Sequence, residues 1–341
     1  MAAQYLHSAQ VIRVFAILAV IVIHTAPFYA WTEEEHLRIS PYYFLNGSAR
    51  FAIPFFFVIS GYFFAQSARR RGAGPALRAF LSRVLLLYFA WGAYYAFLPR
   101  VKDFRKLGYW DAVWKKTVGA FLDSPLDFLF SSPGTHLWFL AALALSAAVG
   151  AAFIARGRLI ALLVVTGLFY VAGLLGGLYH DTPLGIPLFM EAKLGPFGGP
   201  FLFALGMWQA ERGVSVVQER ICIPFIVAGW ITILLEMMAM RLLYNTPQAD
   251  FYIGSVIVAL GLLWFCIAKP DWGKGSRLVG WAGYTLGVYV LHPTILRIPR
   301  LLDFSPEWLF WQFVEPFVIY GVTLGLCMLL ARIVYLRPLV R

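Results

Sequence analysis

Charged residues are scarce in this chain of 341 residues, of which 13% are Asp, Glu, Lys or Arg and 61% are hydrophobic. A soluble domain typically has about 25% charged and about 45–50% apolar residues, so the composition excludes an ordinary soluble protein. Apolar runs long enough to span a membrane recur from one end of the chain to the other. The sequence therefore predicts a polytopic membrane protein.

Cysteines and metal-binding patterns are also rare. The three cysteines, Cys222, Cys266 and Cys327, lie in or beside separate apolar segments without metal-type spacing, so we expect them to be packing residues. The sequence has no glycine-rich phosphate loop and no acidic cluster typical of a zinc or magnesium site. Three histidines could bind zinc, but only across long intervals, and we expect no metal.

The alternating pattern of a transmembrane β-barrel is missing, because the hydrophobic runs are continuous. We predict a single all-α domain over residues 1–341. About ten transmembrane helices are expected, at residues 10–29, 50–66, 80–98, 138–155, 159–178, 196–210, 221–240, 250–268, 281–296 and 312–335.

Basic residues exceed acidic ones, giving a net charge of +11, and they lie mostly between the hydrophobic runs. Membrane topology explains this pattern better than nucleic-acid binding, which we do not expect. If the N-terminus is cytoplasmic, the cytoplasmic segments hold 16 of the 28 Lys and Arg residues, and one long outer loop at about 99–135 holds six of the others. The positive-inside rule therefore predicts two cytoplasmic termini. The long loop is expected to hold a short interfacial or re-entrant helix.

The first predicted helix carries Arg13 and His24, with ten apolar residues between them. Eleven steps of about 100° return almost to the starting angle, and the rise is about 1.5 Å per residue. The two side chains therefore share one helix face roughly 16 Å apart. An ionisable residue at such depth is by default a candidate functional residue. A snorkelling arginine and an interfacial histidine explain the same spacing equally well.

Three further polar residues are predicted at the same membrane level as His24. Arg50 stands at the outer start of the second helix, His136 opens the fourth, and His292 lies near the outer end of the ninth. Each alone could be an interfacial anchor, but their common level favours a site. Histidine suits proton transfer near neutral pH, and arginine can bind an anion or polarise a carbonyl group.

Three other groups of polar residues are candidates for function or for ion pairing. The basic run Arg69, Arg70 and Arg71, followed by Arg78 and Arg83, is either a topology signal that contacts anionic lipid or a docking patch for a phosphorylated donor. His180 and Asp181, in an outer loop, and Glu191 and Lys193 further along the chain are candidates for acceptor binding. Glu236 lies among apolar neighbours, and we expect Arg241 to be its partner.

Four segments in order carry a resemblance to a known family: the Arg13–His24 pair, ARFAIPFFFVISGY, THLWFL and YTLGVYVLHP. Over essentially the whole chain, the sequence resembles the acyltransferase-3 family of integral membrane O-acyltransferases. These enzymes acetylate sugars of lipopolysaccharide, common antigen, exopolysaccharides and Nod factors. The short form, without a fused periplasmic domain, is most similar to the common-antigen O-acetyltransferase branch.

The resemblance implies a multi-pass enzyme of the bacterial inner membrane, surrounded by lipid. Its donor would be acetyl-CoA or another acyl-CoA, and its acceptor a hydroxyl of a carbohydrate or lipid-linked sugar. Within the family pattern, Arg13 and His24 are the essential pair, and Arg50 belongs to the second motif. His24 would be the general base or a transient acyl carrier, and Arg50 or His136 would stabilise the oxyanion. We further expect acyl-CoA to be bound by Arg13, Arg69, Arg70 and Arg71. The acceptor is expected to be bound by His292, His180 and Asp181.

A transporter or exporter of a small or acylated substrate is the alternative, since buried histidine and arginine could line a substrate path. Paired broken helices in corresponding halves of the chain would favour it, and the sequence does not show them. Uptake of solute without acyl-CoA would indicate transport, whereas acyl-CoA turnover would indicate the enzyme.

Overall fold

A computed structural model describes residues 5–29, 40–131, 133–246, 248–302, 304 and 308–341. These residues form helices, and no strand occurs among them. Seven helical stretches are long and apolar enough to cross a membrane: His7–Thr25, Pro41–Arg71, Ala73–Leu107, Thr135–Ile154, Leu159–Gly176, Val216–Tyr244 and Leu309–Leu330. The predicted all-helical, membrane-spanning class is therefore confirmed.

Three of the ten predicted spans correspond to shorter helices. They are α12 (Gly199–Arg212), α14 (Ile253–Ala268) and α16 (Thr285–Leu301), and each has fewer than 18 residues. Pro293 and Pro299 lie inside α16. The count of ten and the side of each terminus stay predictions, since the structure holds no membrane.

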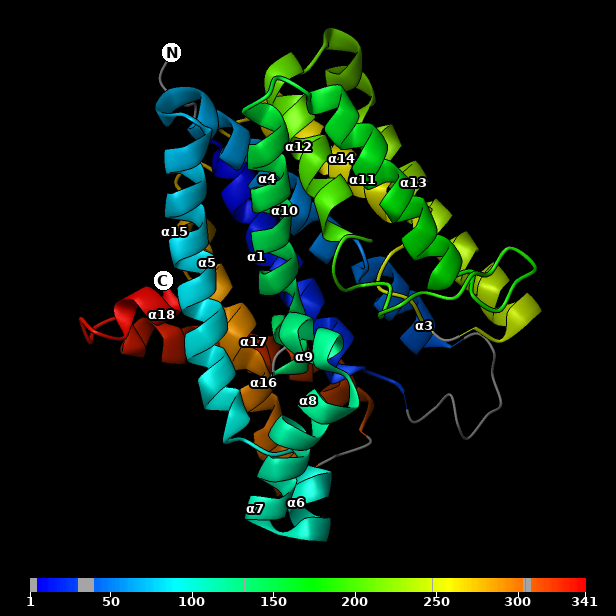
Figure 1. Cartoon of the computed structure of the whole chain (residues 1–341). Coiled ribbons are helices and arrows are strands. Elements are labelled where there is room, and N and C mark those ends of the chain that lie inside the picture. The colour runs from blue at the N-terminus through cyan, green and yellow to red at the C-terminus, as the bar shows by residue number, and fades with distance from the viewer. Residues whose placement is uncertain (1–4, 30–39, 132, 247, 303, 305–307) are drawn as a thin grey trace.

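The long helices of Figure 1 share two ends, which we name by their residues. At the Arg71 end, α1 (His7–Thr25) begins and α4 (Ala52–Arg71) finishes; at the His24 end, α1 finishes and α4 begins. Other helices are α3 (Pro41–Ala49), α5 (Ala73–Ala96), α10 (Trp138–Ile154), α11 (Leu159–Gly176), α13 (Val216–Tyr244), α15 (Arg277–Trp281), α17 (Leu309–Leu330) and α18 (Arg337–Val340).

The predicted outer loop before α10 is built from short helices at the His24 end (Figure 1). They are α6 (Val101–Leu107), α7 (Tyr109–Trp114), the π-helical turn η1 (Lys115–Gly119), α8 (Ala120–Asp123) and α9 (Pro125–Ser131). A 3-10 turn, η2 (Thr135–Leu137), then leads into α10, and a similar turn, η3 (Ala282–Tyr284), leads into α16. Both turns place polar residues beside the central helices.

α4 and α12 pack closely at the centre because glycine faces backbone at their crossing. A Cβ atom on Gly206 would lie 1.9 Å from the carbonyl oxygen of Val58, and one on Gly61 would lie 2.0 Å from that of Phe203. Neither oxygen can move without shifting a helix. Small residues allow such close approach in membrane helices, where lipid removes most of the hydrophobic drive for association. This crossing fixes the position of α4, whose other face borders the cavities described below.

Candidate active site

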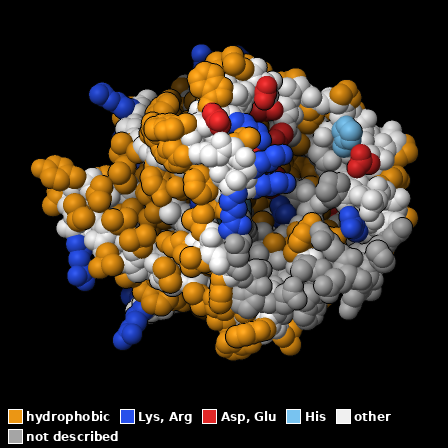
Figure 2. All heavy atoms as spheres, turned by 90° about the horizontal axis from the view of Figure 1, so that it is seen from below, with side chains coloured by type: hydrophobic (Ala, Val, Ile, Leu, Met, Phe, Trp, Pro, Cys, Tyr) orange, Lys and Arg blue, Asp and Glu red, His pale blue; other side chains and the backbone are white. Residues whose placement is uncertain are grey.

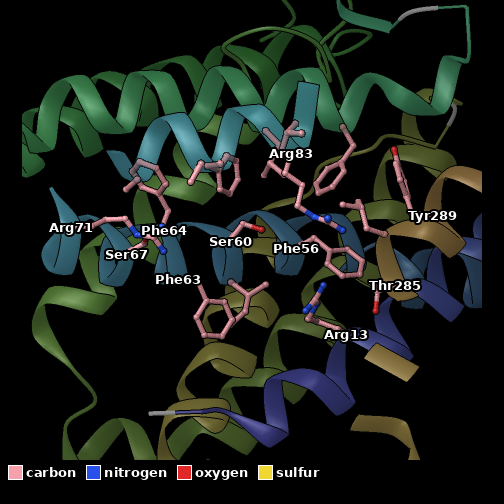
Figure 3. Close-up of a pocket in the computed structure, with 18 residues that line it drawn as sticks. Arg13, Phe56, Ser60, Phe63, Phe64, Ser67, Arg71, Arg83, Thr285 and Tyr289 are labelled. Carbon is pink, nitrogen blue, oxygen red and sulfur yellow. The ribbon is translucent and has the colours of Figure 1, made fainter. Parts of the chain in front are cut away.

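A cavity of about 370 Å³ runs along one face of α4 (Figure 3). Its α4 residues recur at helical spacing, with Phe56, Ser60, Phe63, Ser67 and Arg71 among them. At about 1.5 Å per residue this face is roughly 22 Å long. Further lining comes from α1, α5, α10 and α16. We call it the donor-side cavity; it is long, and its walls are mainly apolar and aromatic.

Three arginines line the donor-side cavity: Arg13 from α1, Arg71 from α4 and Arg83 from α5. Figure 3 shows the guanidinium groups of Arg13 and Arg83 pointing toward one another from opposite walls, with Arg71 toward one end and Tyr289 toward the other. Arg13 also donates from Nη1 to Oε1 of Gln10 at 3.0 Å. Cations in an otherwise apolar channel suit a ligand that combines anionic groups with a long neutral arm.

The predicted arginine run is divided by the structure. Arg71 lines the cavity, whereas Arg69 donates from Nη2 to the carbonyl oxygen of Ala210 at 2.9 Å, next to the end of α12. Arg70 is exposed and is not part of the cavity lining. Arg83, which the sequence placed only among the basic residues that follow, lies in the cavity.

A second cavity of about 160 Å³ lies at the His24 end, and we call it the histidine cavity. It brings together three predicted site residues from different parts of the chain: His24 of α1, Arg50 in the turn between α3 and α4, and His136 of η2. His24 is exposed, whereas His136 is buried. Thr135, Lys193, Asp250 and Tyr289 are also in its lining. The expected common level of His24, Arg50 and His136 is therefore a real proximity in three dimensions.

The three histidines lie side by side, and His292 stands between the other two. Its ring centroid is 5.0 Å from that of His24 and 6.0 Å from that of His136. His292 is fully buried, and its Nδ1 lies 2.7 Å from the carbonyl oxygen of Tyr289. A carbonyl oxygen only accepts, so Nδ1 carries a hydrogen, and Nε2 is the ring nitrogen that faces away from this bond. That Nε2, like Nε2 of His136, is buried without a hydrogen-bond partner among the described residues.

Arg50 is held in a fixed orientation by three polar side chains. It pairs with Asp250 at 3.1 Å and donates to Asn46 at 2.8 Å and to Gln248 at 3.3 Å. Its side chain is only 10% exposed. A guanidinium held in this way needs little rearrangement to meet a developing negative charge.

Asp250 is a site residue that the sequence did not single out, whereas Lys193 was among the candidates for acceptor binding. Lys193 lies 3.9 Å from Asp250 and 2.7 Å from Glu191. Burial alone would lower the pKa of Lys193, but the attraction of Asp250 and Glu191 outweighs it, so the pKa is raised and the ammonium stays charged. The one available signal was position, because Asp250 immediately precedes an apolar run, just as Arg50 does.

His180 and Asp181 line a neighbouring cavity rather than the histidine cavity. They are exposed and pair with each other at 3.1 Å. Their cavity, of about 350 Å³, shares Lys193 and Asp250 with the histidine cavity. Their predicted contact with the acceptor therefore stays a prediction, and it would involve the cavity next to the one that His24 lines.

The expected pairing of Glu236 with Arg241 is wrong. Glu236 accepts from the hydroxyl of Tyr179 at 2.6 Å and from the backbone N–H of Ile253 at 3.0 Å. It therefore lies at the start of α14, where a carboxylate is favoured by the helix dipole. The guanidinium of Arg241 lies over the ring of Tyr43, 5.1 Å from its centroid.

Tyr289 lies in the wall that the two cavities share, since it lines both. Its hydroxyl donates to the carbonyl oxygen of His136, and its ring packs edge-on against Phe139 with centroids 5.4 Å apart. Tyr95 supports the same region through a hydrogen bond from its hydroxyl to the carbonyl oxygen of Val290 at 2.8 Å. Neither role could be predicted from the sequence, because tyrosine is common throughout this chain.

Thiols and metal ligands do not contribute to the site as far as the structure describes the chain. Cys222, Cys266 and Cys327 are free and buried, which confirms their expected role in packing. No group of three His, Cys, Asp or Glu side chains among the described residues has an arrangement that could hold a metal ion.

The fold and the site define a class, which is a polytopic helical membrane protein with two cavities. One cavity is apolar and lined by arginines, the other is lined by histidines, and Tyr289 belongs to both linings. A family model named Acyl_transf_3 and described as an acyltransferase domain matches residues 6–332, nearly the whole chain. The chain therefore belongs to the acyltransferase-3 family, which confirms the resemblance drawn from its motifs. The common-antigen branch stays a prediction.

One curated relative is a protein named amino-acid racemase from Enterococcus faecalis. It is 25% identical over 210 residues, which cover 57% of this chain and 26% of the relative. This chain thus spans only about a quarter of that protein, and the racemase activity in its name is not carried over. No solved structure gives a significant match.

Proposed function

We propose that this protein is an O-acyltransferase of the bacterial inner membrane. It would move an acyl group, with acetyl as the first candidate, from acyl-CoA to a hydroxyl of a cell-envelope sugar. The observation that supports this most is the division of α1 between two cavities: Arg13 lines the donor-side cavity and His24 the histidine cavity. One helix thus carries a cation for the donor and a base for the acceptor.

Acyl-CoA would bind with its phosphates near Arg71 and its thioester near Tyr289. The acyl-bearing arm is long, flexible and largely uncharged, which fits the apolar face of α4 between these two residues. Arg13 and Arg83, which face one another across the cavity, would hold further anionic oxygens (Figure 3). This arrangement replaces the sequence-based set of Arg13 and Arg69–Arg71 with Arg13, Arg71 and Arg83.

The acceptor would approach from the His24 end, where His24 is exposed. An imidazole nitrogen of His24 takes the proton from the sugar hydroxyl as its oxygen attacks the thioester carbonyl carbon. The carbon–sulfur bond then breaks, and the proton on His24 passes to the leaving thiolate of CoA. Arg50, held by Asn46 and Asp250, would stabilise the oxyanion. A transient acyl group on His24 is the other form of this mechanism.

The test uses the purified protein in nanodiscs with radiolabelled acetyl-CoA and an envelope glycan extract as acceptor. Release of CoA together with label in the glycan is the expected result, and it should be lost in His24→Gln. His7→Gln is the matched control, because His7 lies at the other end of the same helix and pairs with Asp271 at 3.4 Å. The proposal is overturned if acetyl-CoA, succinyl-CoA and longer acyl-CoAs all fail to turn over. Uptake of labelled solute into proteoliposomes without acyl-CoA would then favour the transporter.

A further inference from the structure

A basic cavity at the His24 end is not used by the mechanism above. It measures about 750 Å³, and its lining includes five cationic side chains: Arg100, Lys102, Arg105, Lys106 and Arg297. No acidic side chain is among the described residues that line it. Figure 2 looks onto this end of the molecule and shows Lys and Arg side chains gathered near the middle of the face, with acidic groups beside them.

Two of the five cations have a structural role. Arg297 donates from Nη1 to the carbonyl oxygen of Leu98 at 3.2 Å, just beyond α5, and Arg105 donates to that of Leu301 at 3.1 Å, at the end of α16. Carbonyl groups at the end of a helix attract cations, so both contacts are expected from the helix dipole alone. Such capping does not account for the other three cations.

Arg100, Lys102 and Lys106 make no hydrogen bond or ion pair with any other residue that the structure describes. The nearby acid on α6 is Asp103, and it accepts a hydrogen bond from Lys115 at 2.8 Å. Asp103 also attracts the charges of Arg100 and Lys102, but this one carboxylate does not offset the three charges of Arg100, Lys102 and Lys106. An anion inside the cavity would relieve their mutual repulsion.

The positive charges of the basic cavity also affect the neighbouring side chain of Lys116. Its ammonium donates to the carbonyl oxygens of Tyr95 at 2.6 Å and Leu98 at 2.7 Å. Even so, the pKa of Lys116 is lowered to about 8, first by burial and then by the positive charges of Arg297 and Arg100. The field of the basic cavity thus extends to its neighbours.

Thr135 connects the basic cavity with the site of chemistry. It lines both the basic cavity and the histidine cavity, and it is exposed. His136 follows it directly in the chain. A molecule held by the cations would therefore have its remaining atoms beside the opening that leads to His24.

We propose that the basic cavity binds a phosphate or diphosphate group carried by the acceptor, and so holds the acceptor's sugar hydroxyl at His24. The inference rests on the proposed function, because it assigns the acceptor side of the same reaction. Guanidinium and ammonium groups together bind phosphate oxygens through charge-assisted hydrogen bonds. The acceptor class would thus be a phosphorylated sugar or a sugar linked to lipid through a diphosphate.

Binding is measured without catalysis, so that this inference and the acyltransferase proposal can fail separately. Farnesyl diphosphate is titrated against the protein in phosphatidylcholine nanodiscs, with farnesol as the uncharged probe and inorganic pyrophosphate as the soluble one. Saturable binding of either diphosphate, without binding of farnesol, is expected. Comparable affinity for pyrophosphate indicates a soluble phosphorylated acceptor, and binding of farnesyl diphosphate alone indicates a lipid-linked one. Absence of binding for both diphosphates overturns the inference, whatever the result of the acyl-CoA assay.

Substitutions in the basic cavity test whether the diphosphate binds there. Lys102→Gln with Lys106→Gln should weaken diphosphate binding by about tenfold or more, since hydrogen bonds to charged groups are among the stronger ones. Replacement of both by arginine should retain it. The matched control is Lys269→Gln with Lys274→Gln, which removes the same charge from exposed positions at the Arg71 end. Equal weakening by both glutamine pairs would overturn the inference, and unchanged acetyl-CoA binding serves as the check that each variant is folded.

Discussion

Tyr289 donates its hydroxyl hydrogen to the backbone carbonyl oxygen of His136, and it does so from the wall between the donor-side cavity and the histidine cavity. The bond ties α16 to the turn that precedes α10. Tyr289 is thus a residue that borders both the space lined by Arg13 and the space lined by His24. In the proposed reaction, the thioester arrives from the donor-side cavity and the sugar hydroxyl from the histidine cavity, and the two meet beside this ring.

Replacement of Tyr289 should change where the acyl group goes. Tyr289→Ala removes the ring, so water reaches the thioester and the ratio of free acid to acylated glycan rises. Tyr289→Phe keeps the ring and should keep that ratio, although the buried carbonyl of His136 loses its partner at a cost of about 1–3 kcal/mol of stability. Chromatography of the labelled products gives the ratio. The same ratio in Tyr289→Ala as in the wild type would contradict a separating role.

The arginines near the Arg71 end should divide into two functional groups. Arg71→Ala and Arg83→Ala should each raise the KM for acyl-CoA about tenfold, because charge-assisted contacts to phosphate are lost, while kcat changes little. Arg70→Ala is the matched control and should stay within about twofold of the wild type, since Arg70 is outside the cavity lining. Steady-state kinetics with saturating acceptor measures both constants. A larger effect in Arg70→Ala than in Arg83→Ala would refute the assignment.

The crossing of α4 and α12 should not tolerate a methyl group. Gly206→Ala places a Cβ atom 1.9 Å from the carbonyl oxygen of Val58, so the helices must separate. Overpacking costs about 1–3 kcal/mol, and we expect the upper end here because the obstacle is backbone. Gly325→Ala, in α17, meets no atom within 4 Å and should be neutral or slightly stabilising. Thermal unfolding in detergent compares the two, and equal midpoints would contradict the tight crossing.

Lys116 should make stability depend on pH above neutrality. Its pKa is lowered in the folded protein from the ordinary 10.5 to about 8. Between these values the unfolded state binds more protons than the folded state, so stability rises with pH through this window. The unfolding midpoint of the wild type should therefore increase between pH 8 and 10 relative to that of Lys116→Met. Parallel curves for the two proteins would show that the pKa is not shifted.

The sequence was sufficient to predict the class of fold and the proximity of His24, Arg50 and His136. Continuous apolar runs require helices in a membrane, and the spacing of Arg13 and His24 depends on helix geometry alone. The motifs also identified the family that the comparison confirms. His24, Arg50 and His136 each come from a different segment of the chain, and their common depth was enough to predict that they meet.

The features of the site that could not be predicted from the sequence depend on contacts between residues far apart in the chain. Asp250 pairs with Arg50 across 200 positions of the chain, and Tyr289 bonds to His136 across 153. No local pattern specifies such partners. For Glu236 the error was to choose a partner by closeness in sequence. Arg241 lies about one turn away, but Glu236 accepts hydrogen bonds from Tyr179 and from the backbone at the start of α14 instead. Neighbours in sequence were weaker guides here than the packing of distant helices.

In the proposed reaction, donor and acceptor meet from opposite ends of the protein, and His24 is the group that joins them. Proteoliposomes with the protein in one orientation test it directly. Labelled acetyl-CoA is supplied on the side of the Arg71 end, and the glycan acceptor is placed only on the side of the His24 end. We predict that label appears in the glycan with the wild type and with His7→Gln, and that His24→Gln abolishes it. Label only in acceptor that shares a side with acetyl-CoA, or full transfer by His24→Gln, would contradict the claim.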